Sequence, residues 1–326
     1  MGIKNLNQFL KKHTECIKEI DIKDISNTVL AVDTSIFLYK FKYSHKLLEH
    51  FIQQIFHFKK NNIELIYVFD GKPPKEKQNT LDGRKEVKDK YNNKITLLED
   101  TLLNSTGETH LTILNEINEI KRKNIYITKD DITNVKLLFD NLNIKYIQCN
   151  CEADLVCADL YKKGIVYGCL SNDMDFLTFG SGILFRNYNL GDTFLQYNLQ
   201  EILISLELTY EQFIDFCILC GCDYTGKIYR LGNENAYKLI KQYNNIENIL
   251  SNCCGEGKRF KLNNDFDYIN SRIQFNYKYC EEIIIYNSEK KHLTEDDFES
   301  ICKNELFCNI HYSDKTLRSK LGLILG

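Results

Sequence analysis

Three segments of the chain are nearly continuous runs of apolar and β-branched residues. They are 28–33 (TVLAVD), 63–70 (IELIYVFD) and 164–173 (GIVYGCLSND). Apolar runs of this length, without polar alternation, are typical of strands that are buried on both faces of a parallel sheet. The pattern therefore predicts three central strands, and each run ends in an aspartate.

Helical periodicity occupies the segments between these runs. Residues 47–59 and 131–142 each carry apolar side chains at three- and four-residue spacing, which predicts amphipathic helices. An alternation of buried strands and helices is typical of an α/β domain with a mostly parallel sheet. From about residue 200 onward the pattern is helical, with helices expected at 200–220, 233–242, 246–251 and 266–287.

Residues 75–125 do not follow this alternation. The segment is polar, both of its halves repeat apolar residues at helical spacing, and NSTGE at 104–108 is typical of a turn. We expect an inserted helical hairpin that stands off the sheet. It is preceded by Pro73 and Pro74, the two prolines of the chain, which restrict the backbone at the exit from the second strand.

Composition excludes several classes of protein. The chain is 43% hydrophobic and 27% charged, which excludes a disordered or fibrous protein. No apolar run approaches the roughly 20 residues of a membrane helix, and the N-terminus lacks the features of a signal peptide. The net charge of −3 argues weakly against nucleic-acid binding, but residues 72–90 hold seven Lys/Arg against four Asp/Glu.

Cysteine usage predicts a reducing compartment. The count of 13 is odd, and without an export signal we expect reduced thiols and a nuclear or cytoplasmic location, or a site of viral replication. Two clusters are interpreted as buried free thiols, with a zinc site as the open alternative: Cys149 and Cys151, and Cys217, Cys220 and Cys222.

The acids at the strand ends predict a metal site. Side chains at the carboxyl ends of adjacent parallel strands converge on one crevice, and four more acids follow nearby motifs. The full set is Asp33, Asp70, Glu152, Asp154, Asp173, Asp175 and Asp223. Crowded carboxylates repel one another unless a cation lies between them, and oxygen ligands suit Mg²⁺ or Mn²⁺. Seven are enough for two ions acting on a phosphodiester.

Two qualifications apply to this site. Glu152 and Asp154 are two residues apart and do not share a helix face. They reach one site only if the first helical turn is irregular or one acid precedes the helix. A single strand-end aspartate is also often an ordinary turn or helix-cap residue, so the prediction depends on the whole set.

Six blocks carry a family resemblance: MGIKNLNQFL, VDTSIFLYKF, YVFDGKPPKEK, CEADLVCADLYKKG, SNDMDFLTFGS and LCGCDYTGKI. In this order, over about residues 1–250, they resemble the flap endonucleases of the structure-specific 5′ nuclease superfamily. The resemblance implies a PIN-like α/β core, a helical arch and a helix–two-turn–helix. It also implies DNA incision near single-strand/double-strand junctions with two Mg²⁺ ions, for which Mn²⁺ can substitute, in replication and repair.

The resemblance assigns roles by position. All seven acids fall on the family's metal-binding positions, and Lys77 and Arg84 fall on positions whose cations contact the scissile phosphate. Tyr39 falls where the family stacks a base, and Gly2 fits its glycine start near the duplex junction. In the helix–two-turn–helix the family holds duplex phosphates with backbone amides and a K⁺ ion, and the frame is kept by Ile228, Leu231 and Gly232.

The departures from the family pattern are informative. Asp154 replaces the glutamate usual in flap endonucleases, as in the exonuclease branch of the superfamily. Arg230 stands where a glycine is expected and is interpreted as a DNA contact, while residues 233–235 (Asn-Glu-Asn) replace a basic pair. Fewer cations near the phosphates predict weaker binding with less salt dependence. The C-terminus lacks a sliding-clamp motif, so we expect no clamp binding, and we expect a monomer.

We therefore expect one nuclease domain over 1–326. Its parts are an N-terminal core (1–74), a helical arch (75–125), an internal core (126–220), the helix–two-turn–helix (221–250) and a C-terminal helical region (251–326). The leading hypothesis is a 5′ flap endonuclease with 5′ exonuclease activity. The alternatives are a 5′→3′ double-strand DNA exonuclease and a non-catalytic junction-binding replication protein.

Overall fold

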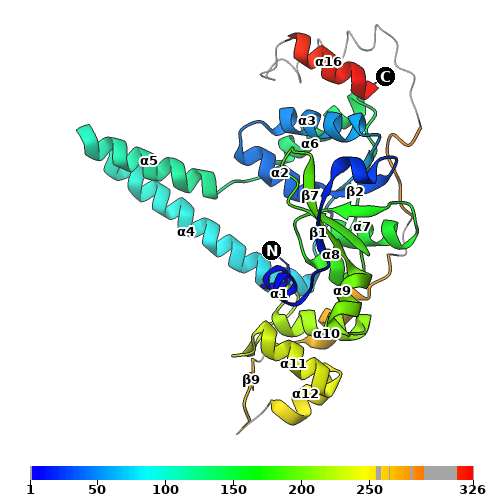
Figure 1. Ribbon diagram of the computed structural model, residues 1–326. Helices are drawn as coiled ribbons and strands as arrows, with labels where there is room; N and C mark the ends of the chain where they lie inside the picture. The colour runs from blue at the N-terminus through cyan, green and yellow to red at the C-terminus, as the bar shows by residue number, and fades with distance from the viewer. Residues whose placement is uncertain (1, 255–257, 264, 280–281, 290–313, 326) are drawn as a thin grey trace.

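The computed structural model describes residues 2–254, 258–263, 265–279, 282–289 and 314–325. Its centre is a seven-stranded sheet in the order β1-β7-β6-β5-β2-β3-β4 (Figure 1). The strands are β1 Ile17–Asp21, β2 Val29–Asp33, β3 Glu64–Phe69, β4 Tyr146–Gln148, β5 Gly168–Leu170, β6 Ile183–Arg186 and β7 Thr193–Asn198. Strands β6, β5, β2, β3 and β4 are parallel, while β7 runs antiparallel to β6 and β1. The predicted α/β fold with a mostly parallel sheet is confirmed.

The three predicted strands lie side by side in the middle of the sheet. β2 pairs in parallel with β3 on one side and β5 on the other. Leu30 and Val32 point into one hydrophobic core and Ala31 into the other, and all three are fully buried. Burial on both faces is the reason for the unbroken apolar runs, and it places the three carboxyl ends at one edge of the sheet.

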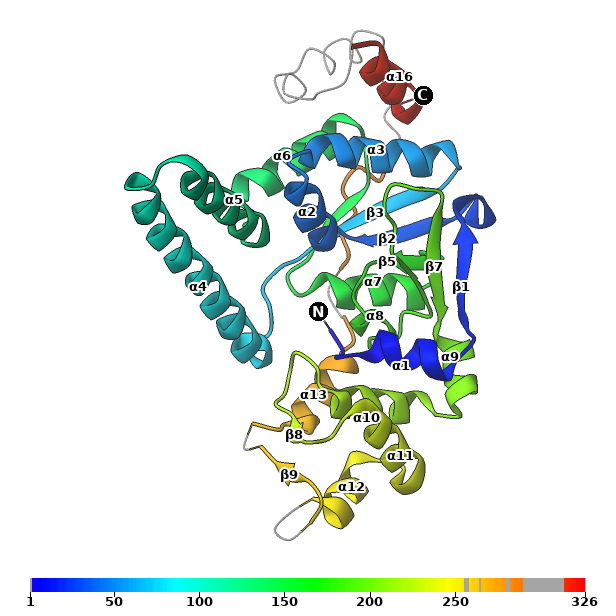
Figure 2. The same cartoon turned by 60° about the vertical axis from the view of Figure 1, so that its left-hand side comes forward.

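Helices cover both faces of this sheet (Figures 1 and 2). One face carries α2 (Thr34–Tyr43), α3 (Leu47–Lys60) and α6 (Lys129–Asn141), and the other carries α7 (Ala153–Lys162) and the short α8 (Asp175–Thr178). The helices predicted at 47–59 and 131–142 are confirmed as α3 and α6. A C-terminal helix, α16 (Asp314–Leu325), packs against α3 and buries Leu321 and Ile324 in the same core.

A long helical hairpin projects from the body of the molecule (Figure 2). It begins with the 3₁₀ turn η2 (Lys75–Lys77) and consists of α4 (Gln78–Leu103) and α5 (Gly107–Lys123). The two helices pack through a small core of their own, which contains Ile95, Ile113, Ile117 and Ile120. This hairpin confirms the insertion predicted at 75–125, and we call it the arch.

A further helical region lies below the sheet in Figure 2. It contains α9 (Leu199–Leu206), α10 (Tyr210–Cys220), α11 (Asn233–Tyr243), α12 (Ile246–Cys253) and α13 (Tyr268–Phe275). The N-terminal helix α1 (Leu6–His13) packs against α9 and α11. Helices α11 and α12 confirm the predictions at 233–242 and 246–251.

Two helix predictions in this region are wrong in extent. The helix expected over 200–220 is interrupted at Glu207, whose φ is 52°, and α10 restarts behind a capping box between Thr209 and Gln212. Of the helix expected over 266–287, the residues that the structure describes (266–279 and 282–287) are helical only within α13. The sequence analysis also did not anticipate the 3₁₀ turn η1 (Ile22–Ile25) or the pairing of β8 (Ile228–Tyr229) with β9 (Lys261–Leu262).

The described cysteines are free thiols, and Cys217, Cys220 and Cys222 are buried. No helix within the described ranges is long and apolar enough to cross a membrane.

Candidate active site

Asp33 and Asp70 lie at the carboxyl ends of adjacent strands. Asp33 ends β2 and caps α2, where it accepts a hydrogen bond from the Ser35 amide at 3.1 Å. Asp70 follows β3 and accepts a 2.8 Å hydrogen bond from the Ala153 amide at the start of α7. The Ser35 hydroxyl donates to Asp70, and the Ser171 hydroxyl donates to Asp33 at 3.0 Å. These bonds fix the orientation of both carboxylates.

Glu152 and Asp154 can reach one site only if one of them precedes the helix, and the structure meets this condition. Glu152 is the N-cap residue of α7 and so precedes the helix, while Asp154 lies in the first turn. The buried Tyr224 hydroxyl donates to Glu152 Oε2 at 2.7 Å, and Lys77 donates to Glu152 Oε1. Both acids can therefore face one site although they are two residues apart.

Asp173 and Asp175 follow β5 at the same edge. The Asp173 amide donates to the Ser171 hydroxyl at 3.0 Å, and the Asp175 amide donates to Asp173 Oδ1 at 3.1 Å. Asp175 is 1% exposed, and within the described residues its Oδ1 atom has no hydrogen-bond partner. Gly2 has a φ of 76°, and a Cβ atom on it would lie 1.8 Å from Asp173 Oδ1 and 2.6 Å from Asp175 Oδ1. Glycine is thus required for the chain to approach these acids.

Burial first, and neighbouring carboxylates second, raise the pKa of several of these acids. Burial, with the added charges of Asp70 and Asp173, raises the pKa of Asp33 to about 8. Burial also raises the pKa of Asp154 well above its usual range, and the carboxylates of Asp33, Asp173 and Asp70 add to this shift. The pKa of Asp175 is raised by burial and then by Asp173 and Asp223. Such mutual repulsion favours the binding of cations.

The arch brings two cations to the same acids. Lys77 Nζ contacts Glu152 and lies 3.7 Å from Asp223 Oδ2, and Arg84 Nη2 lies 2.7 Å from that same oxygen. Burial is the largest single influence on the pKa of Lys77 and lowers it, but the charge and hydrogen bond of Glu152 together with the charges of Asp154 and Asp223 outweigh burial, so the net shift is upward. Thr80, between them on the chain, donates from its hydroxyl to the Asp223 carbonyl at 2.9 Å. Lys77 and Arg84 therefore face the acids together.

The donor set fits hard divalent cations in its chemistry. As the side chains stand in the described residues, no group of three or more His, Cys, Asp or Glu converges closely enough to hold a metal ion. Lys77 and Arg84 engage Glu152 and Asp223, while Asp175 keeps one buried, unpartnered oxygen. Carboxylate oxygens are the ligands that Mg²⁺ and Mn²⁺ prefer. Metal binding at this edge would therefore require Lys77 and Arg84 to release the carboxylate oxygens of Glu152 and Asp223.

Comparison with known proteins identifies the family. The XPG N-terminal domain matches residues 1–91 and the XPG I-region matches residues 143–223. Flap endonuclease 1 of Caenorhabditis briggsae is 34% identical over 273 residues, which cover 77% of this chain and 69% of that protein. Flap endonuclease 1 of Aedes aegypti is 32% identical over 84% of this chain and 74% of its own length. The chain belongs to the flap endonuclease family.

Other members of this family are longer. Flap endonuclease 1 of Plasmodium chabaudi chabaudi is 33% identical over 308 residues, but the match spans 62% of that protein's length. Among solved structures, the catalytic core of Rad2 in complex with DNA substrate has a TM-score of 0.70 at 17% identity, over 99% of this chain and 100% of that chain. Flap endonuclease-1 from Methanococcus jannaschii has a TM-score of 0.65 at 22% identity, over 95% of both chains. At these identities the structures show a shared fold.

Arg230 lies in the segment that resembles the family's helix–two-turn–helix, at a position where the family pattern has a glycine. Arg230 has a φ of 63°, the left-handed conformation that glycine adopts without strain. Its guanidinium group lies 5.1 Å from the exposed Tyr229 ring. Of the predicted frame residues, Ile228 is 3% exposed and packs in the core, so its side chain is not available to DNA. Leu231 packs against the same core and Gly232 is the N-cap residue of α11.

The side chains of this hairpin do not favour the K⁺ ion that the family resemblance implies. Asp223 is engaged by Arg84, and Glu234 by Lys12 at 2.5 Å and His13 at 2.9 Å. The side chains of Lys4 and Lys227 contact each other, and burial and this contact lower the pKa of Lys227. A further cation here would be repelled by the ammonium groups of Lys4 and Lys227.

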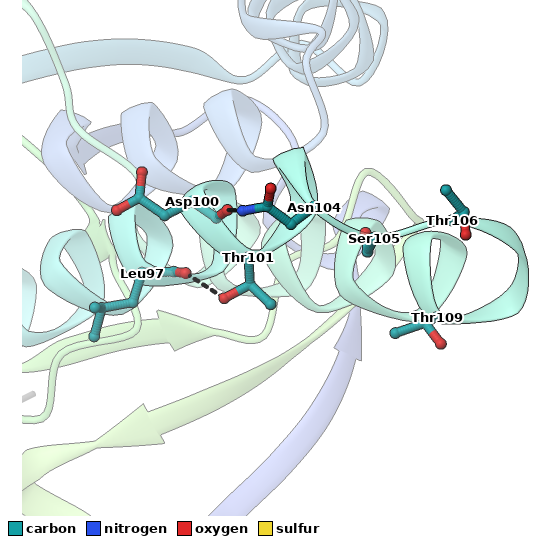
Figure 3. A pocket seen from close by; sticks show the side chains of 7 residues that line it. All are labelled: Leu97, Asp100, Thr101, Asn104, Ser105, Thr106 and Thr109. Carbon is teal, nitrogen blue, oxygen red and sulfur yellow. Dashed lines mark hydrogen bonds between the residues drawn. The ribbon is translucent and has the colours of Figure 1, made fainter.

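A surface pocket at the tip of the arch is a poor candidate for chemistry (Figure 3). Its polar groups bond within the arch: Thr101 donates to the Leu97 carbonyl at 2.8 Å and Asn104 to the Asp100 carbonyl at 3.4 Å. Its lining residues are Leu97, Asp100, Thr101, Asn104, Ser105, Thr106 and Thr109. They are remote in the fold from the acids at the sheet edge (Figure 2).

Three side chains that hold the acids were not among the predicted site residues. Ser35, Ser171 and Tyr224 each bond a carboxylate of the set. Each stands within two residues of a predicted acid, in DTS, SND and CDY. That proximity is a weak signal, because serine and tyrosine are common beside turns and strand ends.

Proposed function

We propose that this chain is a Mg²⁺-dependent, structure-specific 5′ flap endonuclease with 5′ exonuclease activity that cuts DNA near single-strand/double-strand junctions. One observation carries the proposal. Three parallel strands and the elements beside them gather carboxylates at one edge of the sheet, and the arch brings Lys77 and Arg84 to the same carboxylates. Acids that can bind metal and cations that can bind phosphate thus share one site.

The relatives support DNA as the substrate. The curated relatives carry the name Flap endonuclease 1, and the Rad2 catalytic core of similar fold was solved with a DNA substrate. The arch projects from the core (Figure 2), and its base contacts the acids through Lys77 and Arg84. The chain itself has no net positive charge, so binding depends on local cations rather than on a global field.

The site divides the chemistry between groups. Two divalent ions, when bound to the acids, would supply positive charge to the attacking water and to the leaving oxygen of a phosphodiester. Asp33, Asp70, Glu152, Asp154, Asp173, Asp175 and Asp223 would hold these ions, with Mn²⁺ as a substitute. Lys77 and Arg84, released from their ion pairs, would bind the scissile phosphate and stabilise the charge that develops on it.

Cations close to the helix–two-turn–helix would hold the duplex. Lys4 and Lys227 meet at Gly221: the Lys4 amide donates to the Gly221 carbonyl at 3.1 Å, and Lys227 lies over its α-carbon. Two ammonium groups in contact favour an anion, and a DNA phosphate is one. Arg230, exposed on the adjacent turn, would add a third contact. These residues would replace the basic pair that is missing at 233–235.

The test is incision of a 5′-labelled flap substrate. Mg²⁺ should support cleavage, a chelator should abolish it, and Asp173→Ala should reduce the rate at least a hundredfold while leaving DNA binding in place. Binding without cleavage in every divalent ion would favour a junction-binding protein instead. If Asp173→Ala cuts as fast as the parent, the proposed mechanism is wrong.

The same assay separates the endonuclease from the exonuclease. One product of flap length indicates endonuclease activity, and a series of mononucleotides from a nicked duplex indicates the exonuclease that Asp154 suggests. We further propose that the enzyme acts as a monomer in a reducing nuclear, cytoplasmic or viral replication compartment. The free thiols of the described cysteines support the reducing compartment.

A further inference from the structure

Two exposed tyrosines from different parts of the chain flank one lysine of the arch. Lys88 Nζ, on α4, lies 4.6 Å from the ring centroid of Tyr126 and 5.9 Å from that of Tyr39. Tyr39 belongs to α2, and Tyr126 to the connection between α5 and α6. The rings are 45% and 43% exposed. These three residues form what we call the aromatic cluster.

The aromatic cluster lies close to the candidate active site along two elements. Lys88 follows Arg84 by four residues on α4, so both lie on one helix face, about 6 Å apart along the axis. Tyr39 follows Asp33, the cap of α2, by six residues, or about 9 Å. A strand whose phosphate reaches Arg84 would therefore pass the aromatic cluster with its neighbouring nucleotide.

The Tyr126 ring is held in place before any ligand arrives. Asn92, one turn beyond Lys88 on α4, donates to the Tyr126 hydroxyl at 3.0 Å, and Asn124 donates to Asn92 at 2.6 Å. The hydroxyl is thus anchored to the arch while nearly half of the side chain remains exposed. Within the described part of the chain, Lys88 forms no ion pair, so its charge is not neutralised by an acid.

We propose that Tyr126 and Lys88 extend the position where the family resemblance places a stacked base on Tyr39 into a binding site for one unpaired nucleotide, with the base also stacked on the Tyr126 ring and its phosphate bound by the Lys88 ammonium group. Exposed aromatic rings next to an unpaired cation match the two parts of a nucleotide, because every base has a stacking face and every phosphate a negative charge. The Tyr126 ring and Lys88 are the new elements of this site. The inference rests on the proposed function in that the nucleotide belongs to the single strand beside the arch.

The test measures binding without cleavage. A flap substrate with 2-aminopurine at the first unpaired position is titrated in Ca²⁺, and its fluorescence quenching and Kd are compared with the Kd of a nicked duplex that has no flap. Tyr126→Ala should abolish most of the quenching and weaken flap binding about tenfold, with no change for the nicked duplex. Tyr126→Phe, which keeps the ring, should behave as the parent does.

Controls distinguish stacking from a structural role. Tyr43→Ala removes another exposed tyrosine of α2, 54% exposed and outside the aromatic cluster, and should leave the quenching unchanged. Lys88→Ala should weaken flap binding and lower its salt dependence by about one phosphate contact, and Lys88→Arg should restore both. Equal behaviour of Tyr126→Ala and Tyr43→Ala would overturn the proposal. So would a loss of binding in Tyr126→Phe as large as in Tyr126→Ala, since the bond to Asn92 would then be what matters.

The outcome is independent of cleavage. If the parent quenches the probe through Tyr126 but does not cut the flap in Mg²⁺, the nucleotide site stands and the nuclease proposal fails. If the parent cuts the flap and Tyr126→Ala still quenches fully, the nuclease proposal stands and the nucleotide site fails. Unfolding midpoints of all variants identify any that fail to fold. If an alanine variant does not fold, the paired Tyr126→Phe and Lys88→Arg variants decide whether the nucleotide site exists.

Discussion

Arg84 and Asp223 join the arch to the helical region that follows the core. Arg84 Nη2 and Asp223 Oδ2 are 2.7 Å apart although their residues are 139 positions apart in the chain. Asp223 follows α10, and Arg84 belongs to α4. The arch base is therefore held down on the acids by the same guanidinium group that is proposed to bind the scissile phosphate. Under the proposed function, binding of metal to Asp223 and release of Arg84 toward DNA would be two parts of one exchange.

Replacing Arg84 should slow catalysis more than it weakens binding. Arg84→Ala removes a charge proposed to stabilise the transition state, so the single-turnover rate on a flap substrate should fall by about 10²–10³. Its Kd should change less than tenfold. Lys85→Ala, which removes the exposed neighbouring cation, is the matched control and should keep the parent rate within about threefold. Equal effects of the two substitutions would contradict the assignment.

The metal-free protein should lose stability as the pH rises. The pKa of Asp33 is about 8 in the folded protein against an ordinary value of 3.8, so between these values the folded state binds a proton that the unfolded state releases. Stability is therefore greatest at the acidic end of this window and declines toward pH 8. In a chelator the Tm should fall by about 5 °C or more between pH 5.5 and 8.5.

Two comparisons check this pH dependence. Asp33→Asn should flatten the profile, because the amide does not titrate, and Mg²⁺ should raise the Tm most at the alkaline end, where the carboxylates are charged. A Tm that is constant or rises with pH in the chelator would show that the burial and crowding of these carboxylates do not control stability.

The prolines that follow Asp70 should matter for catalysis. Gly71 lies so close to the backbone of residues 149–150 that a Cβ atom on it would be 2.3 Å from the Cys149 carbonyl oxygen. The chain then passes Pro73 and Pro74 directly into η2 and Lys77. Pro73→Ala should lower kcat about tenfold through misplacement of Lys77, and cost only about 0.4–1 kcal/mol in the free energy of unfolding. Denaturant unfolding and single-turnover cleavage measure the two effects. If Pro73→Ala unfolds the protein without a selective loss of cleavage rate, the two prolines have only a structural role.

Arg230→Gly should change stability and binding in opposite directions. Arg230 holds a left-handed φ of 63°, so glycine relieves strain and should stabilise the fold by up to about 1 kcal/mol. The same change removes an exposed cation, so affinity for flapless nicked duplex should fall and the slope of log Kd against log salt should decrease by about one. Unchanged affinity and slope would show that the side chain does not reach the DNA.

The central strands and their acids could be predicted because the signal is local. A strand buried on both faces must be apolar at each position, as Leu30, Ala31 and Val32 are, and the acid that follows is then conspicuous. The hairpin at 75–125 was predictable for the same reason, since its apolar stripe follows helical spacing. The break between α9 and α10 also had a local signal, the capping box of Thr209 and Gln212, which was not used.

The rest could not be predicted because it depends on contacts between distant segments. Tyr224 bonds Glu152 across 72 positions, and Tyr126 reaches Lys88 only because α5 returns along α4. The pair β8 and β9 is two residues long on each strand, which is too short for a periodic pattern. The metal-binding role of the acids and the roles of Lys77 and Arg84 remain predictions, although the structure places them together.

The edge of the sheet has a consequence for synthesis of the chain. Among the described strands β1 pairs only with β7, in the register Ile17 to Tyr197, so β1 leaves the ribosome before its partner, which follows 180 positions later in the chain. Contacts of such long sequence separation form slowly, and until then β1 is an unpaired edge, which is a risk for aggregation. Three of its five residues are charged, namely Lys18, Glu19 and Asp21, and these charges oppose wrong pairing during this interval.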